Sequence, residues 1–293
     1  MVVTFNPRLN TLTELLERLL PQVSRVIVVD NGSSIDIREC ECRSHPQLRM
    51  ILLGDNHGIG AAQNIGIAAA LHGGARYILL SDQDSQPALN MICCLKAAAL
   101  ELMGRGIKVA AVGPRFVDVN QRRPEPFMRI KGLTIQKHWC SGGNAVVEVD
   151  YLIASGCLIP AEAMRAVGAM REEIFIDYVD VEWGLRAGKF GYRSYGVCAA
   201  AMLHRHGDAP ISFMGRQYLA HSPLRHYYRF RNAVWLYRQK HVPLHWKMVD
   251  AIRLLKYYVF YSLLARPQLT HWKMMTLGLF HGVRSRLGRL DRS

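Results

Sequence analysis

Two carboxylates lie one residue apart, at Asp82 and Asp84, directly after the apolar run 77–80. Carboxylate oxygens that converge in one loop are the ligands that hard divalent cations such as Mg²⁺ and Mn²⁺ prefer. A polar loop that caps the following helix would explain this pair alone equally well. A second aspartate-containing turn upstream, at 30–33, favours a metal site at Asp82 and Asp84.

The segment 175–183 places three further carboxylates among bulky apolar residues, at Asp177, Asp180 and Glu182. Partial burial raises the pKa of a carboxyl group toward neutral pH, as a general base requires. Helix capping and a favourable helix-dipole contact would explain one or two of these side chains. The three together indicate a catalytic carboxylate.

Two more polar residues end apolar runs. Asp30 could accept a hydrogen bond from a ribose hydroxyl or a pyrimidine N3–H, although an Asx-turn is the common alternative in Asp-Asn-Gly-Ser. His204 could bind a metal or a diphosphate, although a single histidine is more often structural. The segment 58–63 lacks the third glycine of a dinucleotide-binding loop, which disfavours a dinucleotide-binding fold.

Apolar runs that alternate with helical patterns predict an α/β protein with a mostly parallel central sheet flanked by helices. The expected strands are 1–5, 25–30, 48–53, 77–80, 109–112 and 192–203, and regular structure should also return at 151–160. The expected helices are 10–20, 60–71, 88–103, 161–167 and one that ends near 188. A capping box at Thr11-x-x-Glu14 should start the first helix, and 115–149 should form loops and hairpins. Because ligands bind beyond the carboxyl ends of parallel strands, the polar residues above should share one rim.

The positive charge is concentrated at one end of the chain. The 293 residues carry a net charge of +14, of which residues 1–215 contribute +1 and residues 216–293 contribute +13. Such a basic segment predicts a polyanionic partner: nucleic acid, an anionic membrane or a phosphorylated substrate. The composition, 50% hydrophobic, excludes a disordered or collagen-like chain.

Cysteine usage and the absence of targeting signals predict a cytoplasmic protein. The seven cysteines form no CxxC pair, which disfavours a zinc ribbon or a disulfide scaffold, so reduced thiols are expected. Residues 1–7 lack the pattern of a signal peptide. The longest apolar run of the basic segment, 257–265, is shorter than the ~20 residues that span a bilayer.

Taken together, these segments resemble the family 2 glycosyltransferases of the GT-A fold, and most closely the bacterial rhamnosyltransferases that use dTDP-L-rhamnose. The resemblance covers roughly residues 1–235. Its most specific motifs are Asp82-Gln83-Asp84-Ser85, Phe175-Ile-Asp177-x-Val-Asp180-x-Glu182-Trp183 and Tyr227-Tyr228-x-x-Arg231-Asn232. Its other motifs are Thr4-Phe-Asn6-Pro7, Asp30-Asn31-Gly32-Ser33, Asn56-x-Gly58-Ile-Gly60-x-Ala62-x-Asn64-x-Gly66, Ser155-Gly156 and His204-x-x-Gly207-Asp208.

The resemblance implies a role for each matching position. The residues that would contact the nucleotide sugar are Thr4, Asn6, Asp30, Asn31, Gly58, Asn64, Asp82 and Gln83. The residues that would bind Mg²⁺ or Mn²⁺ are Asp84, Asp82 and His204. Asp180 would be the catalytic base, with Glu182 and Asp177 as second choices. The residues that would contact the diphosphate or the acceptor are Arg225, Tyr227, Tyr228, Arg231, Asn232 and Trp183.

The implied reaction is a single displacement that inverts the anomeric centre. The base would take the proton of an acceptor hydroxyl while the hydroxyl oxygen attacks the anomeric carbon, opposite the leaving dTDP. The sugar of dTDP-β-L-rhamnose would therefore become an α-L-rhamnoside, with the metal offsetting charge on the leaving diphosphate. The acceptor would be a lipopolysaccharide core or another lipid-linked surface glycan.

The resemblance also implies a domain organisation. A catalytic domain would span 1–235, with a nucleotide-sugar half at 1–114 and an acceptor half at 115–235, and a basic amphipathic helical tail would follow at 236–293. Basic residues beside apolar ones in this tail are typical of helices that lie on an anionic leaflet. We therefore expect a cytoplasmic protein, peripheral on the inner face of the bacterial inner membrane. A helix packed on the catalytic domain with a solvated basic face is the alternative.

Other functions are less favoured by the same residues. A family 2 transferase could use another nucleotide sugar, such as a UDP-hexose. A sugar-1-phosphate nucleotidyltransferase would need a glycine-rich basic loop where this chain has Thr4-Phe-Asn-Pro7. A nucleic-acid-binding protein could use the basic tail, but the chain has no zinc finger, RNP motif or clear helix-turn-helix, so no nucleic-acid partner is expected.

Overall fold

The computed structural model describes residues 1–118, 124–140, 143–204, 211–213, 216–218 and 221–290. Its main sheet contains β1 (Val2–Thr4), β2 (Val26–Asp30), β3 (Leu48–Leu52), β4 (Tyr77–Asp82), β5 (Gln86–Pro87), β6 (Val109–Asp118), β9 (Val146–Val149), β10 (Cys157–Pro160) and β11 (Arg193–His204). The strand order is β3-β2-β1-β4-β10-β6-β11-β5, with β9 paired to β11. Two hairpins, β7 (Phe127–Lys131) with β8 (Thr134–His138) and β12 (Ile211–Phe213) with β13 (Arg216–Tyr218), lie outside this sheet.

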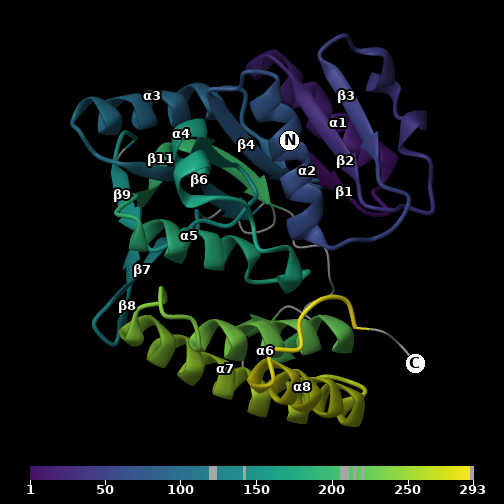
Figure 1. The fold of residues 1–293 in the computed structure, drawn as a ribbon, viewed down its shortest axis with the longest axis vertical. Helices are drawn as coiled ribbons and strands as arrows, with labels where there is room; N and C mark the ends of the chain where they lie inside the picture. The colour runs from purple at the N-terminus through teal and green to yellow at the C-terminus, as the bar shows by residue number, and fades with distance from the viewer. Residues whose placement is uncertain (119–123, 141–142, 205–210, 214–215, 219–220, 291–293) are drawn as a thin grey trace.

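The first four strands are parallel and end at one rim. Val2–Thr4 and Val26–Asp30 are buried along their whole length, as their continuous apolar sequence predicts. The register pairs Thr4 with Asp30 and Val3 with Asp82, so the polar strand ends lie side by side. The helices α1 (Leu9–Leu19) and α2 (Ile59–His72) connect strands of this group, α3 (Met91–Gly104) leads from β5 to β6, and all three cover the sheet (Figure 1).

The second half of the sheet is mixed rather than mostly parallel. Among the described strands of the main sheet, four pairings are parallel and four are antiparallel. β10 runs antiparallel to both of its neighbours, β4 and β6. It occupies the last four residues of the segment 151–160, where regular structure was expected. After β6 the chain leaves the sheet through the β7–β8 hairpin and re-enters it as β9 and then as the antiparallel β10, and an apolar run does not reveal this direction.

The first helix begins earlier than predicted and without the expected capping box. α1 starts at Leu9, and the residue before it, Arg8, makes no side-chain cap. Thr11 therefore lies inside the helix, and Glu14 instead accepts a hydrogen bond of 3.0 Å from the Gln86 amide. The predicted apolar stripe is confirmed, because the leucines that compose it are buried: Leu12, Leu15, Leu16 and Leu19.

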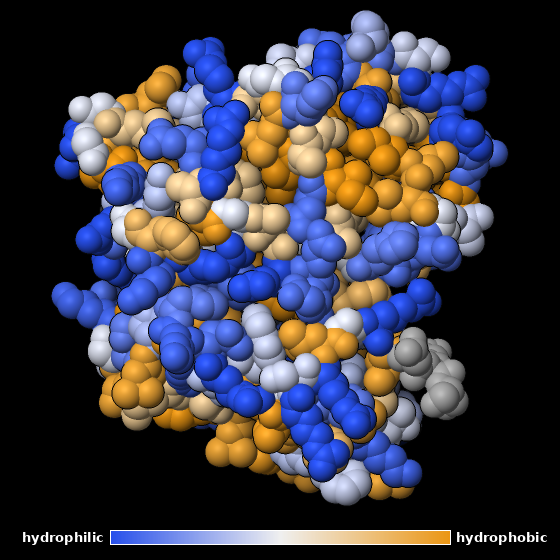
Figure 2. All heavy atoms as spheres, viewed as in Figure 1, coloured by the Kyte–Doolittle hydropathy of each residue, from blue (hydrophilic) through white to orange (hydrophobic). Residues whose placement is uncertain are grey.

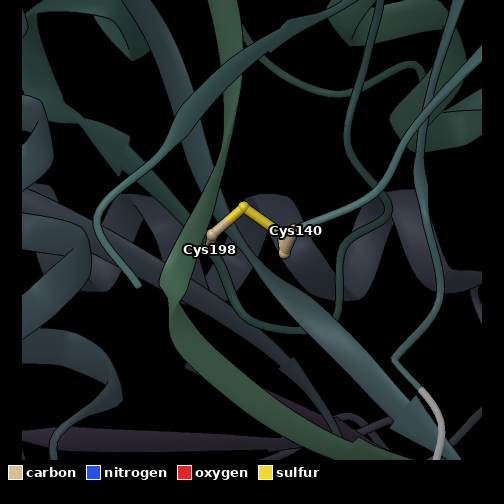
Figure 3. The surroundings of a disulfide bond; sticks show 2 residues. All are labelled: Cys140 and Cys198. Carbon is tan, nitrogen blue, oxygen red and sulfur yellow. A yellow bond between two sulfur atoms is a disulfide. The ribbon is translucent and has the colours of Figure 1, made fainter. Parts of the chain in front are cut away.

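Cys140 and Cys198 form a disulfide, so the expectation of reduced thiols is wrong for this pair (Figure 3). Their Cα atoms lie 5.5 Å apart although 58 residues separate them in sequence. The fold creates this proximity by placing the segment after β8 beside β11, so no short spacing motif could reveal it. The remaining cysteines carry free thiols.

Three helices form a layer beneath the sheet: α6 (Pro223–Tyr237), α7 (Leu244–Leu264) and α8 (Gln268–Val283) (Figure 1). α6 and α8 approach closely, since a Cβ atom added to Gly278 or Gly282 would lie 2.5 Å from a backbone oxygen of α6. The predicted domain boundary at 235 falls inside α6. Among the described residues, no helix combines the length and apolar character needed to cross a bilayer.

Candidate active site

The acidic pair lies at the carboxyl end of β4. Asp82 is the last residue of the strand and Asp84 lies exposed in the turn that follows. The pKa of Asp82 is raised to about 7, mainly by burial and then by the negative charges of Asp84 and Asp180, while the charge of Arg225 acts in the opposite direction. The pair is therefore short of positive charge, and a divalent cation between the two carboxylates would supply it.

The donor chemistry of this pair fits Mg²⁺ or Mn²⁺. Two carboxylates leave coordination positions open for phosphate oxygens and water, which is how these ions usually bind a nucleotide. In the described part of the chain, no group of three or more His, Cys, Asp or Glu side chains is arranged to hold a metal. The side chain of His204, the third predicted ligand, lies outside the described residues.

The candidate base, Asp180, lies in the first turn of α5 (Val179–Lys189). Its carboxylate accepts hydrogen bonds from the backbone N–H groups of Val181 and Ala154, at 2.8 and 3.2 Å. The pKa of Asp180 is raised to about 6, because burial, helped by the charge of Asp177, outweighs the lowering by these two donors. A carboxylate with this pKa is ionised at neutral pH and is still basic enough to take a proton.

The loop before α5 has an unusual backbone. Phe175, Asp177 and Tyr178 have positive φ angles of 68°, 58° and 66°. Non-glycine residues rarely adopt this region, and several in one loop indicate that surrounding contacts enforce the conformation. The loop sets the entry into α5 and thus the position of Asp180. We call 174–178 the base loop.

Two side chains of α6 hold the base loop. The Asn232 amide lies within hydrogen-bond distance of the carbonyls of Ile174, Ile176 and Asp177, at 3.0, 2.6 and 3.0 Å. The Arg231 guanidinium donates to the Ile174 carbonyl at 2.8 Å and to the Gly288 carbonyl at 2.5 Å. Both side chains are fully buried, so the predicted contact of Arg231 and Asn232 with the diphosphate or acceptor is corrected to a supporting role.

Arg225 is the predicted cation that does face the site. It lies in the first turn of α6, it is partly exposed, and its guanidinium lies 3.3 Å from the Asp177 carboxylate. Its charge also lowers the pKa of Asp82. Arg225 is therefore close enough to both carboxylates to attract an anionic group that binds between them.

The strand ends at β1 and β2 form a polar cradle beside the acidic pair. The Thr4 hydroxyl donates to the Asp30 carboxylate at 2.9 Å, and the Ser33 N–H donates to it at the same distance. Asn6 accepts from the N–H of Ser34, and the Gln83 amide bonds to the backbone of Phe5 on both sides. The carboxylate of Asp30 is thus held at the rim by Thr4 from the neighbouring strand and by the backbone of Ser33 in the turn that follows β2.

A comparison with known proteins identifies the family. The sequence model of glycosyl transferase family 2 matches residues 1–155. A dTDP-rhamnosyl transferase, RfbF of Shigella flexneri, is 33% identical over 98% of this chain and 96% of its own length. The chain belongs to glycosyl transferase family 2.

Other relatives agree with this assignment. An N-acetylglucosaminyl-diphospho-decaprenol L-rhamnosyltransferase of Mycobacterium tuberculosis is 24% identical over 89% of this chain and 93% of its own length. The fold matches S. aureus TarS 1–349 in complex with UDP-GlcNAc, with a TM-score of 0.59, 17% identity, and coverage of 96% of this chain and 80% of TarS. It also matches GalNAc-T7 with UDP, GalNAc and Mn²⁺, with a TM-score of 0.60, 10% identity, and coverage of 97% of this chain and 55% of GalNAc-T7. The protein is a glycosyltransferase with the GT-A fold.

Several predicted contacts of this glycosyltransferase are structural instead. Glu182 is fully buried and pairs with Arg186 at 2.9 Å and with His241 at 3.1 Å, so it is not free to act as a base. Trp183 is buried and donates its indole N–H to the Gly168 carbonyl at 2.8 Å.

Tyr227 and Tyr228 are also buried. The Tyr228 ring stacks on Phe175 with centroids 5.0 Å apart, and its hydroxyl accepts from Leu290. The Tyr227 hydroxyl lies 2.8 Å from the His281 ring nitrogen. Both tyrosines therefore pack α6 against the base loop and α8 and do not line the site.

Three residues predicted to contact the nucleotide sugar join neighbouring segments. Asn31 bonds to the backbone of His57 and to the Asn56 amide, at 2.9 and 3.1 Å. Asn64 bonds to both backbone groups of Met170. Gly58 has a φ of 89°, and a Cβ atom there would lie 2.7 Å from the Phe175 carbonyl oxygen. Gly58 therefore lets the nucleotide half approach the base loop closely, Asn64 joins that half to the segment before the loop, and Asn31 fixes the turn at 56–57.

One supporting group was not predicted from the sequence. Asp250 of α7 is buried and accepts hydrogen bonds from the hydroxyls of Tyr178 and Tyr237, at 2.9 and 2.7 Å, and it pairs with Arg253 at 2.5 Å. Tyr178 belongs to the base loop, so α7 also supports the site. The only sequence signal for this role was that Asp250 is one of just two acidic residues in the strongly basic segment 216–293.

Proposed function

We propose that this glycosyltransferase moves L-rhamnose from dTDP-β-L-rhamnose to a hydroxyl group of a surface-glycan acceptor and inverts the anomeric centre. The observation that carries the chemistry is the convergence of Asp180 and the acidic pair Asp82 and Asp84 on one rim, near enough for Asp180 to raise the pKa of Asp82. The choice of donor is supported by the 33% identity, along nearly the whole chain, with a dTDP-rhamnosyl transferase.

In the proposed reaction Asp180 accepts the proton of the acceptor hydroxyl. The hydroxyl oxygen forms a bond to the anomeric carbon while the bond from that carbon to the diphosphate oxygen breaks, and dTDP leaves with the electron pair. Attack from the face opposite dTDP gives an α-L-rhamnoside. The proton remains on the Asp180 carboxyl until solvent removes it.

Charge on the leaving diphosphate would be offset from two directions. Mg²⁺ or Mn²⁺ held by Asp82 and Asp84, with His204 as a further candidate ligand, would neutralise part of it. Arg225 lies close to Asp82 and would attract the same phosphates. Thr4, Asn6, Asp30 and Gln83 at the adjacent strand ends would then hold the base and ribose.

The proposed acceptor is a lipopolysaccharide core or another lipid-linked glycan on the inner face of the bacterial inner membrane. The name of the M. tuberculosis relative describes a sugar-diphospho-lipid acceptor. The basic segment 216–293 would attract an anionic leaflet, which holds such acceptors.

A second donor, a UDP-sugar, has one observation in its favour. One structure of TarS, whose fold is similar, is of its complex with UDP-GlcNAc. Its 17% identity is well below the 33% identity of the dTDP-rhamnosyl transferase, so dTDP-rhamnose remains the proposal. Nucleic-acid binding by the basic segment has no further observation in its favour.

Nucleotide binding tests the donor and the metal together. dTDP with Mn²⁺, at ~100 times its Kd, is expected to stabilise the protein by about 2.7 kcal/mol, which raises Tm by roughly 5 °C. UDP and GDP should give smaller shifts in the same thermal-shift measurement. Asp84→Ala should remove the dTDP shift because one of the two metal carboxylates is lost.

The matched control is Glu101→Ala, which removes an exposed carboxylate on α3. It should keep the full shift with dTDP. A larger shift with UDP would establish the UDP-sugar alternative, and a full dTDP shift in Asp84→Ala would exclude Asp84 as a ligand.

The raised pKa of Asp180 predicts the acid limb of the pH profile. The carboxyl group must be ionised to accept a proton, and burial raises its pKa to about 6, so kcat/KM should fall as pH drops through 6. At pH 5 the value should be about tenfold below the plateau above pH 7. Initial rates across this range give the limb directly, and a rate that stays level down to pH 5 would contradict Asp180 as the base.

A further inference from the structure

One face of α7 is apolar and uncovered. Six large apolar side chains recur every three or four residues along the helix, and they are between 45% and 72% exposed. They are Leu244, Met248, Ile252, Leu255, Val259 and Leu263. With this spacing the six side chains lie on one side of the helix along nearly its whole length.

The opposite side of α7 packs against the rest of the protein. Trp246, Val249, Asp250, Leu254 and Tyr261 are buried against the rest of the protein. The exposed stripe is therefore not needed to hold α7 in place. Monomeric proteins rarely expose contiguous apolar patches of this extent unless the patch binds something.

α8 continues the same surface. Its outer side carries Leu269, Trp272, Phe280 and Val283, all at least 45% exposed. The hydroxyls of Tyr258 on α7 and Thr276 on α8 lie 2.9 Å apart, and Thr276 lies between Trp272 and Phe280, so the two exposed sides adjoin. Figure 2 shows apolar residues along the lower edge of the molecule, where Figure 1 places α7 and α8. We call these two outer sides the apolar face.

The charge around the apolar face has one sign. Exposed cations flank it at Lys256, Arg266, Lys273 and Arg284. Within residues 221–290 the sequence has a single acidic residue, Asp250, and its carboxylate is buried and paired with Arg253. No exposed carboxylate therefore competes for these cations in this part of the chain.

We propose that the apolar face lies in the headgroup layer of an anionic lipid bilayer, with α7 and α8 in the membrane plane. Apolar side chains would enter the acyl boundary, Trp272 would lie at the interface, and the flanking cations would contact lipid phosphates. A second copy of this chain fits less well, because its own apolar face would bring cations against cations. The proposal defines how the membrane location proposed above is achieved, and it is independent of the donor.

This orientation fixes the height of the active site. Gly278 and Gly282 face α6 across the closest helix contact, and α6 in turn holds the base loop through Asn232. Asp180 thus lies above two helix layers at α8 and α6 but above only one at α7, whose Asp250 contacts Tyr178 of the base loop directly, so at 8–10 Å per helix layer it is roughly 10–20 Å from the bilayer surface. The substrate class that fits is a lipid-anchored glycan whose receiving sugar stands clear of the headgroups.

Vesicle flotation tests the proposal directly. The full chain, in EDTA and without nucleotide, should float with vesicles of phosphatidylethanolamine and phosphatidylglycerol and much less with phosphatidylcholine alone. Leu255→Glu with Val259→Glu should reduce the floated fraction at least tenfold. Lys256→Gln with Lys273→Gln should remove the preference for phosphatidylglycerol.

Leu89→Glu with Leu100→Glu is the matched control, because these exposed apolar residues lie next to and within α3, far along the chain from the apolar face. It should float like the original protein. Failure of the original protein to float, or normal flotation of the Leu255 and Val259 variant, would overturn the proposal. If the original protein binds no vesicles and sediments as a dimer, and this variant sediments as a monomer, the apolar face binds a second copy of the chain instead.

The same variants separate this proposal from the proposed function. The Leu255→Glu, Val259→Glu protein should keep the full thermal shift with dTDP and Mn²⁺, because neither residue touches the site. If the original protein floats but shows no thermal shift with dTDP and Mn²⁺, only the proposed donor is overturned and the membrane proposal stands.

Discussion

Asp180→Asn is expected to lower kcat for sugar transfer by roughly 10²–10⁴-fold, the usual contribution of a general base. The amide has nearly the same shape, and its oxygen still accepts a hydrogen bond from the Val181 or Ala154 N–H that now binds the carboxylate. It has no basic oxygen, so the proton of the acceptor hydroxyl has no place to go. Transfer is measured with dTDP-rhamnose and a glycan acceptor, and binding by the thermal shift with dTDP and Mn²⁺.

The binding measurement shows whether Asp180→Asn loses catalysis alone or donor binding as well. The dTDP shift should be unchanged or slightly larger, because Asp180 raises the pKa of Asp82 and its charge opposes an anionic donor. Glu101→Gln, an exposed neutralisation on α3, should leave both measurements unaltered. Turnover close to normal in Asp180→Asn would remove Asp180 as the base and leave Asp177 as the nearest alternative, since Glu182 is buried in ion pairs.

Asn232→Ala is expected to have the second largest effect, through the position of the base and not through contact with substrate. The substitution leaves the carbonyls of Ile174, Ile176 and Asp177 without the amide that now holds them. Loss of these bonds should cost about 2–4 kcal/mol of unfolding free energy. The base loop, with its positive φ angles, would then relax, and a displacement of ~1 Å at the base lowers kcat by about 10²-fold.

Two measurements distinguish positioning from general loss of structure. The loss of kcat should be seen at assay temperatures well below the Tm of the variant, where the protein is folded. The thermal shift with dTDP should persist, because the acidic pair lies on β4. Asn90→Ala is the matched control, since Asn90 is exposed before α3 and makes no side-chain cap. Full activity in folded Asn232→Ala would mean that the base loop holds its shape without this amide.

The strands and their shared rim were accessible from the sequence because apolar runs and polar residues after them report burial and strand ends directly. Val26–Asp30 illustrates this, with all five residues buried and Asp30 at the rim. The raised pKa of Asp180 was also predictable from its apolar neighbours, and burial is indeed its largest cause.

Other features depend on partners that a single sequence does not identify. The direction of β10 is set by where the chain re-enters the sheet, and the pairing of Cys140 with Cys198 by which segments meet there. The Arg231-Asn232 motif marked an important place, but a side chain that binds a ligand and one that binds backbone carbonyls look alike in sequence. Only the buried position of both residues decides between them.

The guanidinium of Arg231 joins Ile174 in the base loop to Gly288, beyond the last helix. The Gly288 N–H also donates to the Glu173 carbonyl at 2.7 Å, so the segment after α8 is bonded both through Arg231 and directly to the residues beside the base loop. Residues near the carboxyl end of the chain thus act as a latch on a loop that lies more than one hundred positions earlier. A substitution in the segment after α8 would therefore shift the base loop and, through it, the catalytic carboxylate, although the two segments are far apart in sequence.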